Sequence, residues 1–397
     1  MDKGNWTYRK LGEICEVQNG LWTGKKPPFV KVGVIRNINF TKDCTLDDSD
    51  IFFTDVEEKA YKKRKLLKGD IIIEKSGGSE KQPVGRPILF DLDGEYSFSN
   101  FTSVLRLNTN ELTPSFLHKA LVGLYFQGKT RPLQSKTTGI HNLDFNKFLQ
   151  FSIPIPPLPI QQRIVAELDC ISSILEKKRQ QLKELDNLAQ AIFYDMFGDP
   201  DEIFIKWNYL TLEEVCLNIV DCPHTTPIKS ETLTKYPCIR TSELKGGTIH
   251  WETMQYVNED EYKKRVSRLV PQNGDIVYGR EGSFGDAVIL PQGWQFCLGQ
   301  RTMLFRVNTN YVNTIFLHRV LISEVVLRQA KDKNVASTVA HVNVKDIKKF
   351  LIPLPPLALQ QSFAAKIEAI EKQKERISQS IKEVQTLFDS RMEVYFG

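Results

Sequence analysis

The sequence predicts an α+β protein in which two similar globular domains alternate with two long helices. Three observations carry this prediction: two heptad patterns of apolar residues, a proline-rich segment before each pattern, and a set of landmarks shared by the two remaining segments. Because these features come in the same order in both halves, we interpret the chain as a duplication. We expect its parts at residues 1–155, 156–198, 199–355 and 356–397.

The two long helices are predicted by apolar residues that recur at alternating spacings of four and three, as in coiled coils. The first seam runs from Ile164 to Met196 and the second from Phe363 to Tyr395, at a constant offset of 199 positions. A single seam is more often the core-facing side of an amphipathic helix, but two matching seams favour helices that pack on each other. The seam residues are Leu168, Ile171, Leu175, Leu182, Leu185 and Ile192 in one helix, and Ile367, Ile370, Ile377, Ile381, Val384 and Phe388 in the other.

The sequences IPIPPL (153–158) and IPLPPL (352–357) precede the two helices. Proline fixes φ and disfavours helix at the preceding residue, so these segments should be extended and each helix should begin at their end. Gly198 and Pro200 mark the expected end of the first helix.

The duplication also predicts how the two helices run. Two packed helices related by an approximate two-fold axis are antiparallel. We therefore expect two long antiparallel coiled-coil helices that separate the globules by about 55 Å, at 1.5 Å per residue. Lys178 and Lys374 interrupt the seams. Each fits either a register-fixing polar position or a lysine extended along the edge of the groove.

The globular segments share landmarks such as Phe116-Leu-His118 with Phe316-Leu-His318, and His141 with His341. Short apolar runs predict strands, and three-and-four spacing predicts one helix in each segment. The expected strands are 70–74, 86–90, 103–107, 275–278, 286–290 and 302–307, and the expected helices are 114–128 and 312–331.

The amino-acid composition limits the classes of protein to which the chain can belong. The chain is 41% hydrophobic and 25% charged, as is usual for soluble proteins, and no apolar run is long enough to span a bilayer. We expect a cytoplasmic protein without a signal peptide. Seven cysteines without a C-x-x-C pair suggest free thiols rather than a disulfide framework or a zinc site. A net charge of +5 is compatible with nucleic acid but does not demand it.

Motifs of catalysis are missing from the sequence. It has no P-loop, no dinucleotide-binding glycine pattern, no H-E-x-x-H and no G-x-S-x-G. Asp70, Glu74 and Lys75 weakly resemble a nuclease metal site, but the equivalent segment after Asp275 lacks the second carboxylate and the lysine. These observations favour a binding protein, with no metal site, over an enzyme.

Four polar segments have the composition of a DNA-contacting surface. Lys and Arg bind phosphates, while Arg, Gln, Asn, Ser and Thr can read base edges. An ordinary solvated loop is an equally good interpretation of any one segment. His141 and His341 also fit the role of hydrogen-bonded structural histidines. The candidates are Lys75, Ser76, Ser79, Lys81, Gln82, Lys129, Arg131, Gln134, Lys136, Thr138 and His141 in the first globule, and Arg280, Ser283, Arg328, Lys331, Lys333, Ser337, Thr338 and His341 in the second.

These residues give the chain a resemblance to a known family. The repeated IP(I/L)PPL…QQ segment before a heptad helix, the VDCPHTTP segment at 220–227, Ile239-Arg240, and Gly274-Asp275 with Arg280 and Gly282 all resemble type I restriction–modification specificity subunits. The segment LWTGKK (21–26) with Val34–Asn37 resembles a variant of the first-globule motif. The resemblance covers essentially the whole chain and adds Lys25, Lys26, Arg36, His224, Thr225, Thr226 and Arg240 to the DNA-binding candidates.

The resemblance implies that each globule is a target-recognition domain that reads one half of an asymmetric, split double-stranded DNA site. The helix pair would set the gap and dock two methyltransferase subunits, which use S-adenosylmethionine. The full complex would add two restriction subunits that use ATP and Mg. The subunit itself would be non-catalytic and bind no cofactor and no membrane.

The two globules depart from each other within this pattern. Lys75 stands where the second globule has Arg280, and the first globule lacks the CPHTTP segment. The resemblance therefore implies that the two globules read different sequences. The alternatives are a coiled-coil adaptor that does not bind DNA, a stand-alone enzyme, and a specificity subunit of a related system in which one partner chain both cleaves and methylates.

Overall fold

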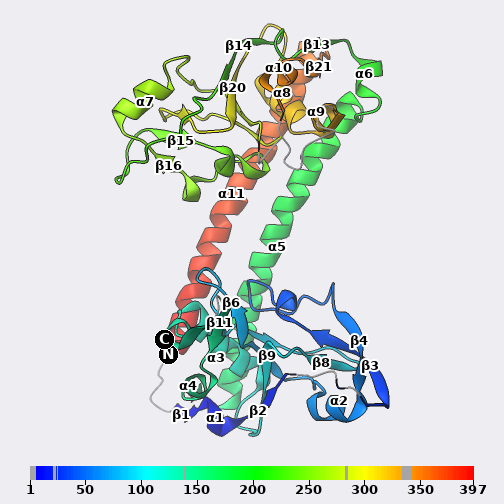
Figure 1. Ribbon diagram of the computed structural model, residues 1–397, viewed down its shortest axis with the longest axis vertical. Helices are drawn as coiled ribbons and strands as arrows, with labels where there is room; N and C mark the ends of the chain where they lie inside the picture. The colour runs from blue at the N-terminus through cyan, green and yellow to red at the C-terminus, as the bar shows by residue number, and fades with distance from the viewer. Residues whose placement is uncertain (1–5, 21–23, 25, 138–139, 282–284, 333–341) are drawn as a thin grey trace. The chain divides into compact units, whose positions relative to one another are not determined.

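The computed structural model describes residues 6–20, 24, 26–137, 140–281, 285–332 and 342–397. The chain forms two compact units. Unit 1 comprises Met1–Arg179 and Gln379–Gly397, and unit 2 comprises Gln180–Ser378. Each unit therefore combines one globule with one end of each long helix, α5 (Leu158–Phe197) and α11 (Leu357–Phe396) (Figure 1).

Unit 1 is built on a four-stranded antiparallel sheet in the order β2-β9-β5-β7, formed by Cys15–Asn19, Thr102–Leu107, Ile71–Glu74 and Pro87–Leu89. The other sheets are β4-β3-β8 (Phe52–Glu57, Phe29–Ile35, Tyr96–Phe98), β10-β11-β6 (Gln134–Thr137, Ile140–Leu143, Ser76–Gly78) and β1-β12 (Thr7–Lys10, Ser152–Ile155). The helices are α1 (Leu11–Ile14), α2 (Glu58–Arg64), α3 (Pro114–Phe126) and α4 (Phe145–Phe148), with 3-10 turns at Asn37–Asn39 and Arg131–Leu133.

Unit 2 repeats the central sheet in the same order, β14-β20-β17-β18, formed by Cys216–Asp221, Thr302–Val307, Ile276–Gly279 and Ala287–Ile289. Its other sheets are β16-β15-β19 (Gln255–Tyr256, Pro237–Ile239, Cys297–Leu298) and β13-β21 (Tyr209–Thr211, Leu351–Pro353). The helices are α6 (Ile203–Lys206), α7 (Glu259–Arg265), α8 (Thr314–Leu321), α9 (Glu324–Asp332) and α10 (Val344–Ile347), with 3-10 turns at Thr241–Glu243, Lys245–Gly247 and Trp251–Thr253. The predicted α+β fold of two repeated domains is confirmed.

One element differs from the sequence-based expectation. A single helix over 312–331 is wrong, because the segment forms α8 and α9 with a break at Ile322 and Ser323. The Ser323 hydroxyl donates to the Val320 carbonyl at 2.7 Å and accepts from the Val325 amide at 3.3 Å. A serine that bonds the backbone on both sides competes with the helical hydrogen-bond pattern and starts a new helix.

The two long helices begin with the same hydrogen bonds, which are made by Gln161 and Gln360 shortly after the two proline-rich segments. The buried Gln161 amide accepts from the Thr113 amide at 2.9 Å and donates to the Pro156 carbonyl at 2.8 Å. Gln360 repeats both bonds at 2.8 Å, with the Asn313 amide and the Pro355 carbonyl. Because Thr113 and Asn313 cap α3 and α8, this glutamine ties each long helix to the helix of its own globule.

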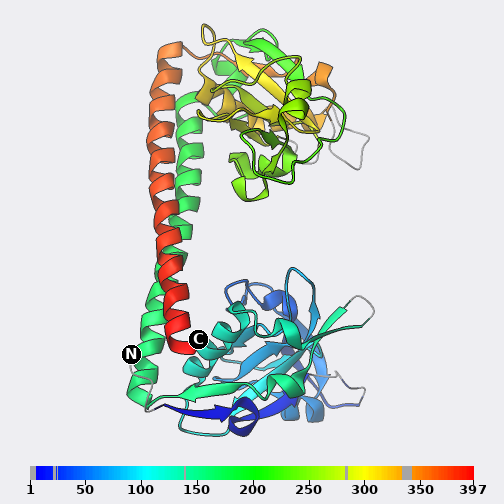
Figure 2. The ribbon, with the colours of Figure 1, turned by 90° about the vertical axis from the view of Figure 1, so that its left-hand side faces the viewer.

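Within each unit the two long helices run antiparallel. In unit 1 the Tyr395 hydroxyl, near the end of α11, donates to Glu167 near the start of α5 at 2.6 Å, and Figure 2 shows these two ends side by side. In unit 2 the Lys374 ammonium lies 2.7 Å from Asp186, and Phe193 near the end of α5 packs on Phe363 near the start of α11. Lys374 thus serves as an ion-pair partner between the helices.

The heptad seam is buried at both ends of the helix pair and less so between them. Leu168, Ile171, Leu175, Leu185, Ile367, Ile370 and Phe388 are buried, whereas Leu182, Ile192, Ile377, Ile381 and Val384 are half-buried. Near the helix ends the buried positions move to Phe193 and Phe197, and to Met392 and Phe396. A straight helix drifts by about 20° per heptad from a strict seven-residue repeat, which brings the next position into the contact.

Each globule packs on the end of the helix that comes from the other half of the sequence. In unit 1 Phe116 of α3 lies edge-on to Phe396, with ring centroids 5.4 Å apart. In unit 2 Phe316 of α8 packs the same way on Phe197 at 4.7 Å. The aromatic residues at the two helix ends are therefore equivalent core positions of the two units.

One of the two recurring histidine pairs, His118 and His318, is structural. Their Nε2 atoms donate to the carbonyls of Cys44 and Ala287 at 3.0 Å and 2.8 Å. Burial lowers the pKa of each imidazole to about 4, so both are neutral at pH 7.

The pH dependence of stability follows from these lowered pKa values. The unfolded chain binds a proton at each histidine below about pH 6.5, whereas the folded chain does not until about pH 4. We expect the free energy of unfolding to fall by about 3 kcal/mol per histidine across this window, because one pKa unit corresponds to 1.36 kcal/mol. Urea denaturation at pH 7, 5 and 4 measures it. A chain with His118→Gln and His318→Gln should lose less stability than the wild type over this range, and equal losses would contradict the assignment.

Candidate nucleic-acid interface

The polar segments singled out in the first globule meet in one small sheet. β10, β11 and β6 pair antiparallel, with Lys136 opposite His141, His141 opposite Gly78, and Asn142 opposite Ser76. The interpretation of these polar segments as solvated loops is therefore wrong for Ser76, which lies in β6, and for Gln134 and Lys136, which lie in β10. Residues 76–78, 134–137 and 140–143, which include segments distant in sequence, therefore pair in one sheet.

Several of the candidate residues hold this sheet together. The Ser76 hydroxyl donates to the Asn142 side-chain oxygen, and the Asn37 amide donates to the Ser76 carbonyl at 2.6 Å. The Gln134 oxygen accepts from the Val84 amide at 3.2 Å and lies 3.3 Å from His141 Nδ1. The other candidates of these two segments are exposed: Ser79, Lys81, Gln82, Lys129 and Arg131.

Lys75 lies at the end of central strand β5 and contacts the neighbouring part of the same sheet. Its ammonium donates to the Asn19 side-chain oxygen at 3.4 Å, and Asn19 ends β2. The Ser103 hydroxyl donates to the same oxygen at 3.2 Å. Lys75 is half-buried, so Asn19 fixes the direction of a cation that remains partly accessible.

Of the remaining first-globule candidates, the structure describes Arg36 and Lys26. The Arg36 guanidinium stacks over the Phe52 ring at 5.2 Å and lies 4.0 Å from the exposed Asp50 carboxylate. Lys26 is exposed. Lys25 and Thr138 lie outside the described residues.

The weak resemblance of Asp70 and Glu74 to a metal site has a structural explanation. Arg106 binds Asp70 at 2.6 Å, and Arg86 binds Glu74 at 2.7 Å. Both carboxylates are buried and neutralised by arginine. They belong to the framework of the sheet.

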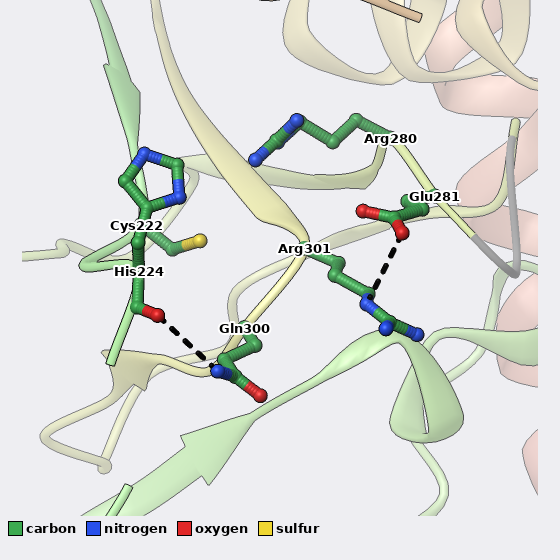
Figure 3. A pocket seen from close by; sticks show the side chains of 6 residues that line it. All are labelled: Cys222, His224, Arg280, Glu281, Gln300 and Arg301. Atoms are coloured by element: carbon green, nitrogen blue, oxygen red, sulfur yellow. Dashed lines mark hydrogen bonds and ion pairs between the residues drawn. The ribbon is translucent and has the colours of Figure 1, made fainter. Parts of the chain in front are cut away.

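In unit 2 a depression of about 200 Å³ lies at the equivalent end of the central sheet (Figure 3). It is lined by Cys222, His224, Arg280, Glu281, Gln300 and Arg301. Arg280 follows β17 and is 7% exposed. Its Nε donates to Asp221 Oδ1 at 3.1 Å, and His224 Nε2 lies 3.2 Å from the other Asp221 oxygen. One carboxylate thus orients an arginine and a histidine.

The backbone of the segment His224–Thr226 is held by the side chains of Arg265 and Gln300. The Arg265 guanidinium donates to the Thr225 carbonyl at 2.6 Å, and is itself buried and paired with Glu261 at 2.8 Å. The Gln300 amide donates to the His224 carbonyl and to the Thr226 hydroxyl, both at 3.3 Å. The three side chains of the segment remain exposed on this fixed backbone.

Two predicted arginines of unit 2 already have carboxylate partners. The Arg240 guanidinium binds both oxygens of the fully buried Glu243, at 3.1 Å and 2.6 Å. Arg328 on α9 binds Asp201 at 2.6 Å. Lys331 lies in the same helix, and Ser283, Lys333, Ser337, Thr338 and His341 lie outside the described residues.

Sequence reasoning missed Asn19 and Asp221, and also four residues that line the depression: Cys222, Glu281, Gln300 and Arg301. Strand pairing identifies the first two as equivalent, because Asn19 is opposite Ser103 and Asp221 is opposite Met303 in matching strands. Arg301 adopts a left-handed φ of 66° and places its guanidinium 3.5 Å from Glu281. An alignment of the two halves by strand register could have found the Asn19–Asp221 equivalence, since both residues precede the divergent segments.

The lining of the depression is mainly polar. Burial raises the pKa of the Cys222 thiol, and a thiol that stays protonated is a poor nucleophile. The other lining side chains are hydrogen-bond donors and acceptors. No helix among the described residues is long and apolar enough to cross a membrane.

Comparisons with known proteins agree with this architecture. The model of the type I restriction modification DNA specificity domain matches the chain twice, over residues 3–186 and 205–386. The chain is 21% identical over 408 residues to the putative type I restriction enzyme MjaX specificity subunit of Methanocaldococcus jannaschii, covering 96% of this chain and 92% of that one. It is 23% identical over 361 residues to the EcoKI specificity subunit of Escherichia coli K12, covering 86% and 75%. The MjaVIII specificity subunit of M. jannaschii is 24% identical over 286 residues, covering 64% of this chain and 65% of that subunit.

Solved structures share the fold. The S subunit of a type I restriction–modification system from M. genitalium aligns with a TM-score of 0.56 and 15% identity over 99% of this chain and 96% of that one. A chain from a structure on the assembly and conformational transition of a type I system aligns with a TM-score of 0.57 and 18% identity over 98% and 97%. Both family matches cover a globule together with most of the long helix that follows it, and together they span most of the sequence. The chain belongs to the type I restriction modification DNA specificity family.

Proposed function

We propose that this chain is the DNA-recognition subunit of a type I restriction–modification enzyme and reads an asymmetric bipartite site in double-stranded DNA. Each globule, residues 1–155 and 199–355, acts as a target-recognition domain for one half-site. The candidate residues of the two interfaces contact DNA, with phosphate contacts supplying most of the affinity and base contacts the discrimination.

One observation carries the proposal. The two units have the same central sheet order, β2-β9-β5-β7 and β14-β20-β17-β18, but different side chains at the same end of that sheet. Unit 1 has Asn19 and Lys75 there, and unit 2 has Asp221 and Arg280. Equivalent scaffolds with different polar side chains suit the reading of two different half-sites.

The helices α5 and α11 serve two further roles in this proposal. Each is 40 residues long and continuous, so the pair sets the gap between the half-sites. A repeated scaffold also presents two equivalent docking faces, which suits two methyltransferase subunits, and through them two restriction subunits. This chain is not itself catalytic and binds no cofactor. S-adenosylmethionine belongs to the methyltransferase, and ATP with Mg to the restriction subunit.

Methylome sequencing of a host that carries this gene with its partner methyltransferase gene tests the proposal. The control is the same host with this gene deleted. We expect a split, asymmetric methylated motif that disappears on deletion. Unchanged methylation, or the loss of a continuous palindromic motif, would refute two-domain recognition and favour a coiled-coil adaptor that binds only protein.

A further inference from the structure

We propose that Arg280, oriented by Asp221, reads a guanine in the half-site of the second globule, and that Asp221 is its positioning residue. This inference rests on the proposed function and names the contact that gives unit 2 part of its specificity. It also identifies Lys75 and Asn19 as the equivalent pair of unit 1.

The first step of the argument is the state of the Arg280 guanidinium. Its Nε is bound to Asp221 at 3.1 Å, and the described residues offer its two terminal nitrogens no further hydrogen-bond partner. Figure 3 shows the guanidinium lying within the depression and directed toward the His224 ring. Arg280 thus presents a fork of two donors to an incoming ligand.

The second step separates a base from a phosphate. Guanine offers two acceptors, O6 and N7, on its major-groove edge, and a fixed arginine fork is their usual partner. Phosphates are more often bound by exposed cations that adapt their position. Arg280 is 7% exposed and fixed by a carboxylate that is itself mostly buried, whereas the neighbouring Arg301 is 57% exposed on its side chain. The burial and fixation of Arg280 favour base reading, and the exposure of Arg301 favours a phosphate.

The third step is the equivalence of the two units. Glu74 and Gly279 are opposite Thr102 and Thr302 in the matching sheets, so Lys75 and Arg280 follow them at the same position. Each cation is held by the residue that ends the outer strand two positions away in the sheet, Asn19 of β2 or Asp221 of β14. An uncharged amide suffices for the point-like ammonium of lysine, whereas the guanidinium is held through Nε by a carboxylate. The site is therefore built twice, with different donors.

The experiment measures methylation by the complete complex of this chain with its partner methyltransferase. Substrates are duplexes that carry, one position at a time, each of the four base pairs in both half-sites. Arg280→Ala removes the fork, Arg280→Lys keeps the charge without it, and Asp221→Asn keeps the shape of the positioning residue without its charge. The first half-site in the same duplex is the internal control.

We expect Arg280→Ala and Arg280→Lys each to reduce the preference for guanine at one position of the second half-site by about 10- to 100-fold, as for loss of a bidentate contact. Asp221→Asn should reduce the same preference by a smaller factor at the same position. Preferences in the first half-site should not change. A merely structural Asp221 would lower the melting temperature of unit 2 without altering base preference.

Other outcomes would overturn the inference. If the Arg280 variants methylate all duplexes more slowly by the same factor, and their DNA binding depends less steeply on salt, Arg280 is a phosphate contact. An unchanged rate and preference would mean that Arg280 does not touch DNA. In both cases the wild-type chain would still read a bipartite motif, so the proposed function would stand. If the wild-type chain directs no bipartite methylation, the proposed function itself fails.

Discussion

Replacing Phe396 with alanine is expected to lower the free energy of unfolding of unit 1 by about 4 kcal/mol, as for other buried phenylalanines. Phe396 is 8% exposed and packs against Phe116 of α3, with Met392 one helical turn before it. A methyl group added at Gly123 would come within 3.2 Å of Phe396 Cβ, so α3 and α11 are in direct contact. The last turn of α11 thus stabilises the first globule.

Hydrogen exchange measures this effect locally. In Phe396→Ala the amides of α3 should exchange faster, while those of α8 should keep their protection. Phe197→Ala, the equivalent change in unit 2, should do the reverse, because Phe197 packs on Phe316. Val394→Ala is the matched control, since Val394 is 38% exposed on the same helix end. Equal loss of protection in both globules after either change would mean that the two units do not unfold separately.

The second large effect is expected from Arg86→Met in unit 1. Arg86 and Glu74 are 4% and 2% exposed and joined by bonds of 2.7 Å and 3.2 Å. Arg86 also donates to the Phe40 carbonyl at 3.0 Å. Removing the arginine leaves a buried carboxylate and a carbonyl without partners, which costs about 3–5 kcal/mol.

Urea denaturation followed by tryptophan fluorescence and circular dichroism measures the Arg86→Met effect. The double variant Arg86→Met with Glu74→Gln removes the stranded charge and should regain part of the lost stability. Unit 2 has Gly279 at the position of Glu74 and should be unaffected. A double variant no more stable than Arg86→Met alone would show that the carboxylate is not the source of the cost.

Regular elements were predictable from the sequence because their signal is periodic. The heptads gave the two long helices within a few residues, and the apolar runs gave the central strands such as β5 and β17. The break at Ser323 was missed because a single side chain that bonds its own backbone outweighs the helical pattern. The sheet β10-β11-β6 was missed because its polar strands show no apolar alternation, and their pairing depends on contacts between distant segments.

The candidate interface was predictable by residue type but not by partner. Arg240 and Arg280 look alike in the sequence, yet Arg240 is held at two points by the buried Glu243, whereas Arg280 retains two free donors toward the described residues. The distinction depends on Asp221, which lies 59 positions before Arg280 and meets it only through the sheet. Long-range pairing of this kind leaves no local pattern in a single sequence.

The central claim, that each globule reads its own half-site, is tested most directly by the methylome of a chain with one globule in both places. Residues 200–354 are replaced with a second copy of residues 1–155, and the chain is expressed with its partner methyltransferase. The account predicts a methylated motif in which one half-site of the wild-type motif occurs twice with a gap between the copies. Retention of the wild-type second half-site, or a motif without a gap, would contradict it.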